Sequence, residues 1–180
     1  RPVVIGSGPC GLFAALSLAR MGLKPLILER GRSVRQRTRD VWGFWRKRRF
    51  NAASNVQFGE GGAGTFSDGK LYSGIKDRGH HIRKILQDFV DCGAPEEILY
   101  VSKPHIGTLR LVKVVEGLRE RILAAGGEFR FEAQAIDLHL ENNSVRGVGL
   151  ENGEQIEASH VALAVGHSAR DTFEMLHTKG

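Results

Sequence analysis

Three glycines near the start of the chain have the spacing of a turn that binds phosphate. They lie in the hexapeptide GSGPCG, residues 6–11, directly after the apolar segment 2–5. In a GxGxxG turn the first glycine allows the tight bend, the second lets the backbone approach a pyrophosphate, and the third permits close packing of helix and strand. A helix beginning here also offers free N–H groups and a partial positive charge to phosphates. The residues expected beside a dinucleotide are therefore Gly6, Gly8, Pro9, Cys10 and Gly11.

A carboxylate follows at the distance that this kind of turn requires. Glu29 comes 29 − 6 = 23 residues after Gly6 and closes the apolar segment 26–28. An acid in this place accepts the ribose hydroxyls of a dinucleotide, and it would repel a ribose 2′-phosphate. Just beyond it, Arg30 or Arg35 could neutralise the phosphates. The motif alone does not separate FAD from NAD, and a glycine turn in an unrelated α/β protein is the alternative.

These residues need a strand, a helix and a second strand to position them. Residues 2–5 and 26–28 are short apolar runs of the kind found in buried strands. Between them, the apolar side chains of residues 12–19 have helical spacing, and Gly22 marks the end of the helix. Strand, glycine turn, helix and strand in this order predict a βαβ unit with two parallel strands.

The remainder of the chain predicts further helices, then strands. Helical spacing occurs over residues 34–45, 82–90 and 108–125, with Thr108 as the expected N-cap, whereas residues 58–70 are too rich in glycine for regular structure. After residue 127 the period changes to two, and strands are expected at 129–131, 135–140, 145–150, 155–157 and, as a continuous apolar run, 161–165. A closing helix begins at residue 170. The predicted fold class is α/β, a Rossmann-like parallel sheet with an inserted antiparallel β-meander.

The positive charge of the protein is concentrated in one segment. The 180 residues carry a net charge of +6, but residues 30–49 hold nine basic residues and one acid, which is +8, so the others sum to 6 − 8 = −2. A charged helix of this kind most often presents a solvated or packing face, with Trp42, Phe44 and Trp45 holding it to the domain. Cofactor phosphate or nucleic acid are the alternatives, and nucleic acid is the least favoured of these.

Cysteine usage and hydropathy limit the remaining classes. No apolar run reaches the ~18 residues needed to span a bilayer. Cys10 and Cys92 form neither a CxxC pair nor a metal-ligand spacing, so we expect a cytoplasmic protein without a metal site. Cys10, within the phosphate turn, is expected to act as a small packing residue.

Three longer motifs resemble a known family. Residues 54–71, SNVQFGEGGAGTFSDGKL, residues 103–108, KPHIGT, and residues 166–173, GHSARDTF, are similar to stretches of bacterial FAD-dependent dehydrogenases of uncharacterised substrate. The order of elements also resembles the FAD domain of the glutathione-reductase type. The resemblance covers essentially the whole chain. It implies that residues 1–180 are the N-terminal part of a single FAD-binding domain, a fragment of a larger flavoprotein, ending before the Gly-Asp segment that holds the flavin and before the substrate or cap region.

The resemblance also implies further contacts with the cofactor. The glycine-rich loop would contribute its exposed N–H groups, and the strand after residue 127 would place backbone near the adenine. The final apolar strand would reach the cofactor at its last residues. The residues implicated in this way are Gly61, Gly62, Gly64, Thr65, Ala135, Val165, Gly166 and His167.

The expected function is that of an FAD-dependent oxidoreductase, a dehydrogenase of unknown substrate. This chain would supply the ADP-binding half of the FAD site, and we expect it to be inactive by itself. A small-molecule substrate or electron acceptor and NAD(P)H as electron donor are the expected partners, whereas no membrane partner is expected. No residue is identified as catalytic. The alternatives are an NAD-dependent dehydrogenase that uses residues 6–29 alone, and a flavin-containing RNA-binding or RNA-modifying protein that uses the basic helix within 30–49.

Overall fold

The computed structural model describes residues 1–72 and 76–179, in which a βαβ unit is followed by a run of helices, a run of strands and a closing helix. In chain order they are β1 (Val3–Ile5), α1 (Pro9–Arg20), β2 (Leu26–Leu28), α2 (Val34–Lys47), the 3-10 helix η1 (Ala63–Phe66), α3 (His81–Asp91), the 3-10 helix η2 (Glu96–Leu99), α4 (Thr108–Ala124), β3 (Glu128–Arg130), β4 (Ala135–Glu141), β5 (Ser144–Leu150), β6 (Gln155–Glu157), β7 (Val161–Leu163) and α5 (Arg170–Lys179).

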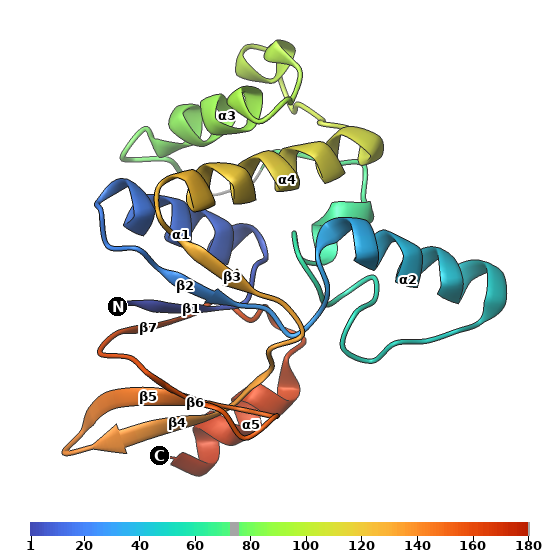
Figure 1. The fold of residues 1–180 in the computed structure, drawn as a ribbon. Coiled ribbons are helices and arrows are strands. Elements are labelled where there is room, and N and C mark those ends of the chain that lie inside the picture. Colours follow the sequence, from blue (N-terminus) through green and yellow to red (C-terminus); the bar gives the residue numbers. More distant parts are fainter. Residues whose placement is uncertain (73–75, 180) are drawn as a thin grey trace.

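A parallel four-stranded sheet separates two layers, as Figure 1 shows. Its strand order is β3-β2-β1-β7, and every pair in it is parallel. Helices α1, α3 and α4 lie on one side, whereas the antiparallel sheet β4-β5-β6 and helix α5 lie on the other. The α/β fold with its inserted meander is thus confirmed.

Alternation along β1 and β2 sends their side chains into two separate cores. Val4 and Ile27 face the helical layer, where they join Leu16 and Leu118. Their neighbours Val3, Ile5, Leu26 and Leu28 face the meander and join Val148 and Leu150. Because both faces of the sheet are covered, β1 and β2 are buried throughout and read as continuous apolar runs in the sequence.

The meander forms where the sequence predicts it, and its turns explain why. Asn142 and Asn143 both have positive φ, 50° and 57°, which Asn tolerates better than most residues, and they connect β4 to β5. At the next turn Gly153 has φ 86°. The turns therefore fix the order β4-β5-β6 through local backbone geometry.

Three sequence expectations need correction. Strand β7 ends at Leu163 instead of residue 165, and Leu163 is 41% exposed, because β7 is paired only with β1 among the described residues and forms an edge of the sheet. Gly107 is the N-cap of α4, while Thr108 is its first residue and donates its hydroxyl to the carbonyl of Ser67 at 2.7 Å. The glycine-rich segment contains one regular turn, η1, where the run of positive-φ glycines is interrupted.

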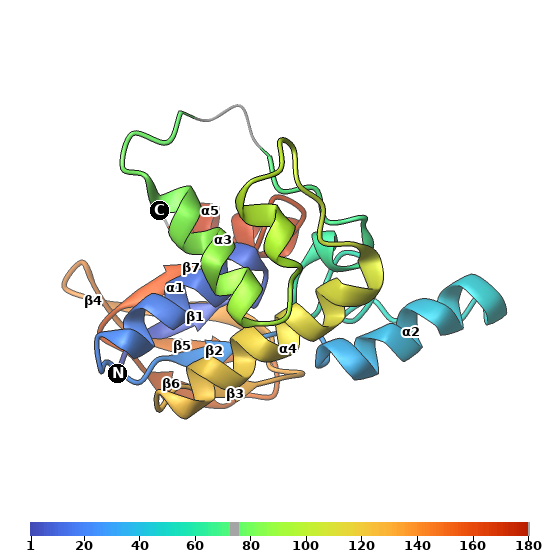
Figure 2. The same ribbon diagram turned by 90° about the horizontal axis from the view of Figure 1, so that it is seen from above.

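Helix α2 extends away from the body of the molecule, and Figure 2 shows the same arrangement from above. Its buried residues are Val34, Arg37 and Val41, all in its first two turns. The aromatic residues expected to hold it to the domain do not do so, since Trp42, Phe44 and Trp45 are 47%, 41% and 53% exposed. None of the described helices is long and apolar enough to cross a membrane.

Candidate functional site

A cleft of about 440 Å³ opens at the carboxyl ends of β1, β2 and β7. In open parallel sheets this edge is where ligands bind, because the loops that follow neighbouring strands converge there. The turn after β1, the end of β2, the glycine-rich loop, the start of β4 and the residues after β7 form the walls. Of the residues predicted from sequence, those lining the cleft are Gly6, Gly8, Pro9, Cys10, Glu29, Arg30, Gly62, Ala135, Val165, Gly166 and His167.

Glycine occurs at each of these positions of the phosphate turn for a different physical reason. Gly6 has φ 98° and donates its N–H to the carbonyl of Leu28 at 2.8 Å, so it makes the tight bend. Gly11 lies behind the cleft wall, where an added Cβ would be 1.9 Å from the carbonyl oxygen of Gly6. Helix α1 can therefore approach β1 only with glycine at this position.

Gly8 is different, because the protein itself does not require glycine there. Its φ of −69° and ψ of −177° suit any residue, and an added Cβ would meet only the Cα of Gly62, at 3.7 Å. The space beside Gly8 belongs to the cleft. A glycine at such a position fits a ligand that approaches the backbone closely, as a pyrophosphate does in this motif.

The N-terminus of α1 provides donors at the same place. The first intrahelical bond runs from the N–H of Leu12 to the carbonyl of Gly8 at 2.9 Å, so the N–H groups of Cys10 and Gly11 precede the helical ladder. Pro9 at the first helical position has no N–H to satisfy. Cys10 is exposed and lines the cleft, so the prediction that it packs internally is wrong. The helix start presents its partial positive charge to the cleft.

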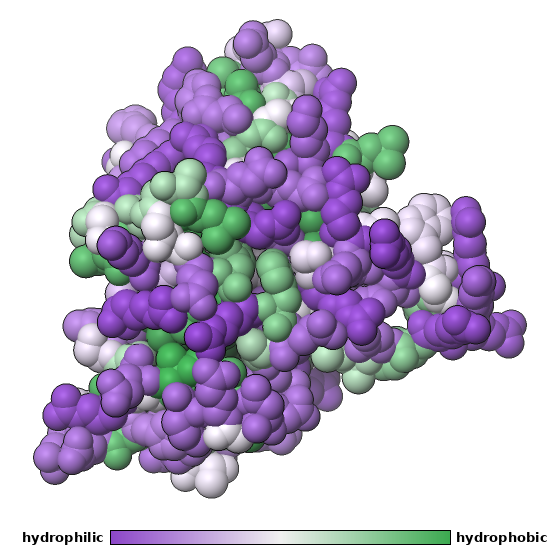
Figure 3. Space-filling view, in the orientation of Figure 1, coloured by the Kyte–Doolittle hydropathy of each residue, from purple (hydrophilic) through white to green (hydrophobic). Residues whose placement is uncertain are grey.

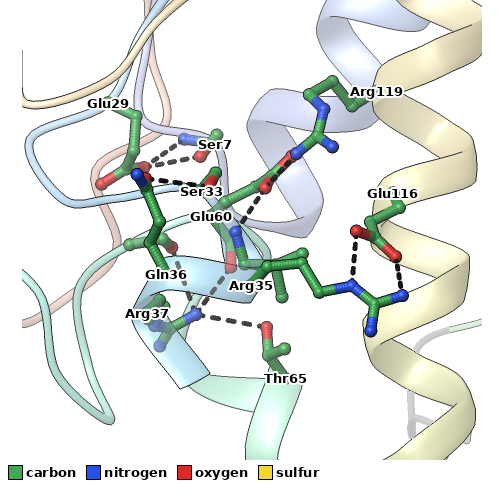
Figure 4. A network of polar contacts seen from close by, with 12 residues as sticks. Ser7, Glu29, Ser33, Arg35, Gln36, Arg37, Glu60, Thr65, Glu116 and Arg119 are labelled. Atoms are coloured by element: carbon green, nitrogen blue, oxygen red, sulfur yellow. Dashed lines mark hydrogen bonds and ion pairs between the residues drawn. The ribbon is translucent and has the colours of Figure 1, made fainter. Parts of the chain in front are cut away.

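The Glu29 carboxylate is fixed in position by backbone and side-chain donors (Figure 4). Its Oε2 accepts hydrogen bonds from the N–H and the hydroxyl of Ser7, at 2.9 and 2.7 Å, and its Oε1 accepts one from the N–H of Gly31 at 2.8 Å. Glu29 is only 4% exposed and borders the cleft. Ser7 was not predicted from sequence. Its position inside the glycine hexapeptide was the available signal, because the turn that brings Gly6 to Gly8 also points Ser7 at the end of β2.

Arg37 organises the glycine-rich loop from the opposite side. Its guanidinium donates to the carbonyls of Asn55, Val56, Glu60 and Gly62 at 2.7–2.8 Å, and it is fully buried. Burial lowers the pKa of Arg37 to about 10, although the charges of Glu29 and Glu60 oppose this change. The expectation of a solvated charge is wrong here. Arg37 lies three residues after Val34 and four before Val41, and this position on the buried stripe was the signal in the sequence.

Glu60 completes the support beneath the loop. Its Oε2 accepts hydrogen bonds from the N–H of Val34 and from Arg119, both at 2.6 Å, while its Oε1 is buried without a hydrogen-bond partner in the described part of the chain. Burial raises the pKa of the Glu60 carboxyl, and the bonds from Val34 and Arg119 reduce this effect. Glu60, like Arg119, was missed from sequence because the contacts join α2, the loop and α4.

The Arg30 side chain forms another wall of the cleft. Its guanidinium lies 4.5 Å from the ring centroid of Phe58 and bonds both carboxylate oxygens of Asp171, at 2.9 and 3.0 Å. Asp171 also accepts a hydrogen bond from Gln134 at 2.9 Å. Partial burial raises the pKa of Asp171, but the hydrogen bonds and charge of Arg30 lower it by more. The pKa of Asp171 is therefore below its ordinary value. Arg35 lies outside the cleft and pairs with Glu116 instead.

The other predicted residues either line the cleft or hold the loop that lines it. Gly61, Gly64 and Thr65 do not line the cleft. Thr65 is buried and donates its hydroxyl to the carbonyl of Gly62, so it holds the part of the loop that does line it. Cleft residues that sequence reasoning missed follow β7, precede β4 or belong to α5 and the loop; they are Gln57, Phe58, Ala133, Ser168, Thr172, Phe173 and Leu176. No group of three or more His, Cys, Asp or Glu within 1–72 and 76–179 is arranged to hold a metal ion.

The basic residues of segment 30–49 fall into two groups, those that are paired within the described part of the protein and those that are not. Arg30, Arg32 and Arg35 form ion pairs, and Arg37 is bonded to the loop. The basic residues without an ion pair in the described structure lie further along α2 and just beyond it; they are Arg39, Arg46, Lys47, Arg48 and Arg49. These five charges lie outside the cleft.

Parts of the chain are similar to known proteins. Residues 4–59 match the family described as NAD(P)-binding Rossmann-like domain. The chain is 49% identical over 177 residues to an uncharacterized protein of Clostridium beijerinckii, matching 98% of this chain but only 33% of that protein.

Two solved structures share the fold over 99% of this chain. One is THI4 from Thermovibrio ammonificans, with a TM-score of 0.62, 20% identity and 62% of that chain covered. The other is L-proline dehydrogenase from P. horikoshii, with a TM-score of 0.61, 14% identity and 56% of that chain covered. The chain therefore has a fold of the Rossmann type, and its residues 4–59 match a domain described as NAD(P)-binding, which suggests a dinucleotide cofactor. It spans a third of the bacterial relative.

Proposed function

We propose that this chain supplies the ADP-binding half of the FAD site of an oxidoreductase that acts on a small molecule. The observation that carries the proposal is the convergence, in one cleft, of the open backbone at Gly8, the start of α1 and the fixed carboxylate of Glu29. These are the groups that a pyrophosphate and a ribose require. When bound, FAD supplies two-electron redox chemistry, and the protein binds and orients it.

The residues of the chain have distinct parts in this proposal. The N–H groups at the start of α1 receive the pyrophosphate, and Glu29 accepts a ribose hydroxyl on Oε1, which in the described structure accepts one hydrogen bond, from Gly31. Gly62 closes the other wall, because its Cα lies against Gly8. The residues after β7, Val165 to His167, form the wall where the bound molecule would extend beyond its ADP half.

Two arguments favour FAD over NAD as the ligand. The motifs over residues 54–71, 103–108 and 166–173 resemble FAD-dependent dehydrogenases, and two of these motifs contribute cleft residues, such as Phe58 and Gly166. A solved structure with this fold is named as OTEMO in complex with FAD and NADP, and its likeness covers 92% of this chain with 15% identity and a TM-score of 0.50. NAD(P)H as electron donor and a cytoplasmic location are part of the proposal.

The first experiment is the visible absorption spectrum of the purified protein, before and after incubation with FAD, with mass identification of whatever denaturation releases. Flavin bands and released FAD are the expected result. Released NAD would support the NAD-dependent dehydrogenase instead. A protein that retains neither cofactor and takes up no FAD would contradict the proposal.

A substitution at Gly8 locates the site. Gly8→Val is compatible with the extended backbone before Pro9, and it fills the space that the pyrophosphate would use. We expect FAD affinity to fall at least about tenfold, which is about 1.4 kcal/mol, with little change in the thermal midpoint. Gly43→Val on α2 is the matched control, because an added Cβ at Gly43 has no atom within 4 Å, and it should leave FAD affinity unchanged.

A further inference from the structure

The outer half of α2 carries a cluster of aromatic side chains that nothing in the described structure covers. Trp42 and Trp45 lie edge to face with centroids 5.6 Å apart, and Phe44 contacts Phe50 at 5.7 Å. Their exposed fractions range from 41% for Phe44 to 65% for Phe50. These two pairs place four exposed aromatic residues within nine positions of the chain, and exposed apolar side chains at this density indicate a site of contact. We call these four residues the α2 aromatic surface.

The helical register indicates that this surface continues an internal packing face. Residues 34, 37 and 41 are fully buried, and position 45 is next on the same stripe, one turn further along. Trp45 is exposed only because α2 at that point extends past the body of the domain (Figure 1). Trp42 and Phe44 flank the stripe. Trp45 thus continues the side of α2 that packs against protein, with Trp42 and Phe44 on either side of it, which favours a protein occupant over a membrane or a nucleic acid.

The charges around the surface restrict the occupant further. The guanidinium of Arg46 lies 4.6 Å from the ring centroid of Trp42, and Arg48 and Arg49 follow directly; none of them forms an ion pair within the described residues. Figure 3 shows hydrophilic side chains around the projecting end of α2. A second copy that paired symmetrically through this surface would bring like charges together, which opposes association. An apolar partner with an acidic rim fits instead.

The length of the relative shows that a domain similar to this chain occurs within a longer polypeptide. The C. beijerinckii protein matches 98% of this chain, yet two thirds of that protein lie outside the match. We propose that, in longer proteins of this kind, the α2 aromatic surface packs against the part of the same polypeptide that lies outside the matched third, through an apolar centre and an acidic rim. This contact does not depend on the dinucleotide that the cleft binds.

The test is hydroxyl-radical footprinting of a chimera in which residues 1–180 replace the matched third of the C. beijerinckii protein. Trp42 and Trp45 are the only tryptophans of the chain, and Tyr100, which is 78% exposed on another part of the domain, is the internal reference. Burial of the interface centre lowers the labelling of both tryptophans by about fivefold relative to Tyr100, after correction for intrinsic reactivity. Labelling in proportion to their exposure in the structure described here would overturn the proposal.

The other occupants give different results in the same assay. Protection that increases with protein concentration would indicate a second copy, and protection that requires added single-stranded RNA or anionic vesicles would indicate those ligands. Each of these outcomes overturns the proposal.

Substitutions add an energetic readout. Trp42→Ser with Trp45→Ser in the chimera lowers its thermal midpoint if the surface is buried, whereas solvent-exposed tryptophans can be replaced with little loss. Leu109→Ser is the matched control, because Leu109 is 91% exposed and lies at the start of α4. An equal midpoint for the double variant and the control would contradict the proposal, even where the footprint shows protection.

Discussion

Replacing Arg37 tests the central physical claim about the cleft, that a buried guanidinium determines the shape of the glycine-rich loop. Arg37→Met retains the length and the apolar stem of the side chain while removing its donors. The carbonyls of residues 55, 56, 60 and 62 then lose their partner in a region from which Arg37 itself excludes water. The loop carries Gly62 in the cleft wall, so its distortion should reach the site.

The magnitude follows from the number of acceptors left behind. A hydrogen bond to a charged group contributes about 1.5–3 kcal/mol, and a buried acceptor left without a partner costs about 1–3 kcal/mol. Burying the charged guanidinium is itself unfavourable, as the lowered pKa of about 10 indicates. Removing the guanidinium removes this desolvation cost, which offsets part of the stability lost with the hydrogen bonds. We expect Arg37→Met to lower the free energy of unfolding by about 3–5 kcal/mol, which is comparable to breaking a buried ion pair.

Denaturant unfolding followed by circular dichroism measures this change. Arg39→Met, two residues along the same helix, is the matched control, because Arg39 is exposed and forms no ion pair in the described structure; it should change stability by less than about 0.5 kcal/mol. Arg37→Lys keeps the charge but has fewer hydrogen-bond donors, so its loss of unfolding free energy should lie between those of Arg37→Met and Arg39→Met. If Arg37→Met and Arg39→Met have the same effect, Arg37 does not hold the loop and the reasoning is refuted.

Three further substitutions test α2, the support beneath the loop and the ion pair on α5. Gly43→Ala should raise the free energy of unfolding by about 0.5–1 kcal/mol, since Gly43 is inside a helix and its added Cβ meets nothing; a loss of stability would show a hidden contact. Burial raises the pKa of Glu60 in the folded state, so its contribution is fully present below its unfolded value of 4.5 and is lost as pH rises through the folded pKa. Glu60→Gln should therefore appear less destabilising at neutral pH than in acid, and a difference independent of pH would contradict this assignment. Asp171 has a lowered pKa and stabilises the fold above its unfolded value of 3.8, so Asp171→Asn should cost less than about 1 kcal/mol at neutral pH and nothing once the carboxyl is protonated, as measured by thermal unfolding across pH.

The elements were predictable because each has a strong local signal. The two apolar strands of the first βαβ unit, the helical spacing over 34–45 and the Asn and Gly turns of the meander all lie at the predicted positions. Errors occur at boundaries and at edges. The last strand was predicted to reach residue 165 but ends at Leu163, because the length of a strand depends on the neighbours it pairs with, which the local pattern does not encode.

The phosphate turn shows which residues of a site can be predicted from their spacing in the sequence. Residues 6–10 and Glu29 line one cleft because the short connection between two parallel strands brings the turn and the end of the second strand to the same edge of the sheet. Residues on the far wall are different. Phe58 and Phe173 enter the cleft from segments more than 100 residues apart, and no spacing rule joins them.

The sequence by itself thus determined the βαβ unit, the glycine turn and the acid that follows it, since these depend on backbone conformation over fewer than 30 residues. Tertiary structure decided which charges of the basic segment are internal. Arg37 and Arg39 are the same residue type two positions apart on one helix, yet one is fully buried and the other is exposed. The difference arises because one face of α2 meets the glycine-rich loop and the residues before it, whose carbonyls accept hydrogen bonds from all three guanidinium nitrogens of Arg37, whereas the opposite face meets water.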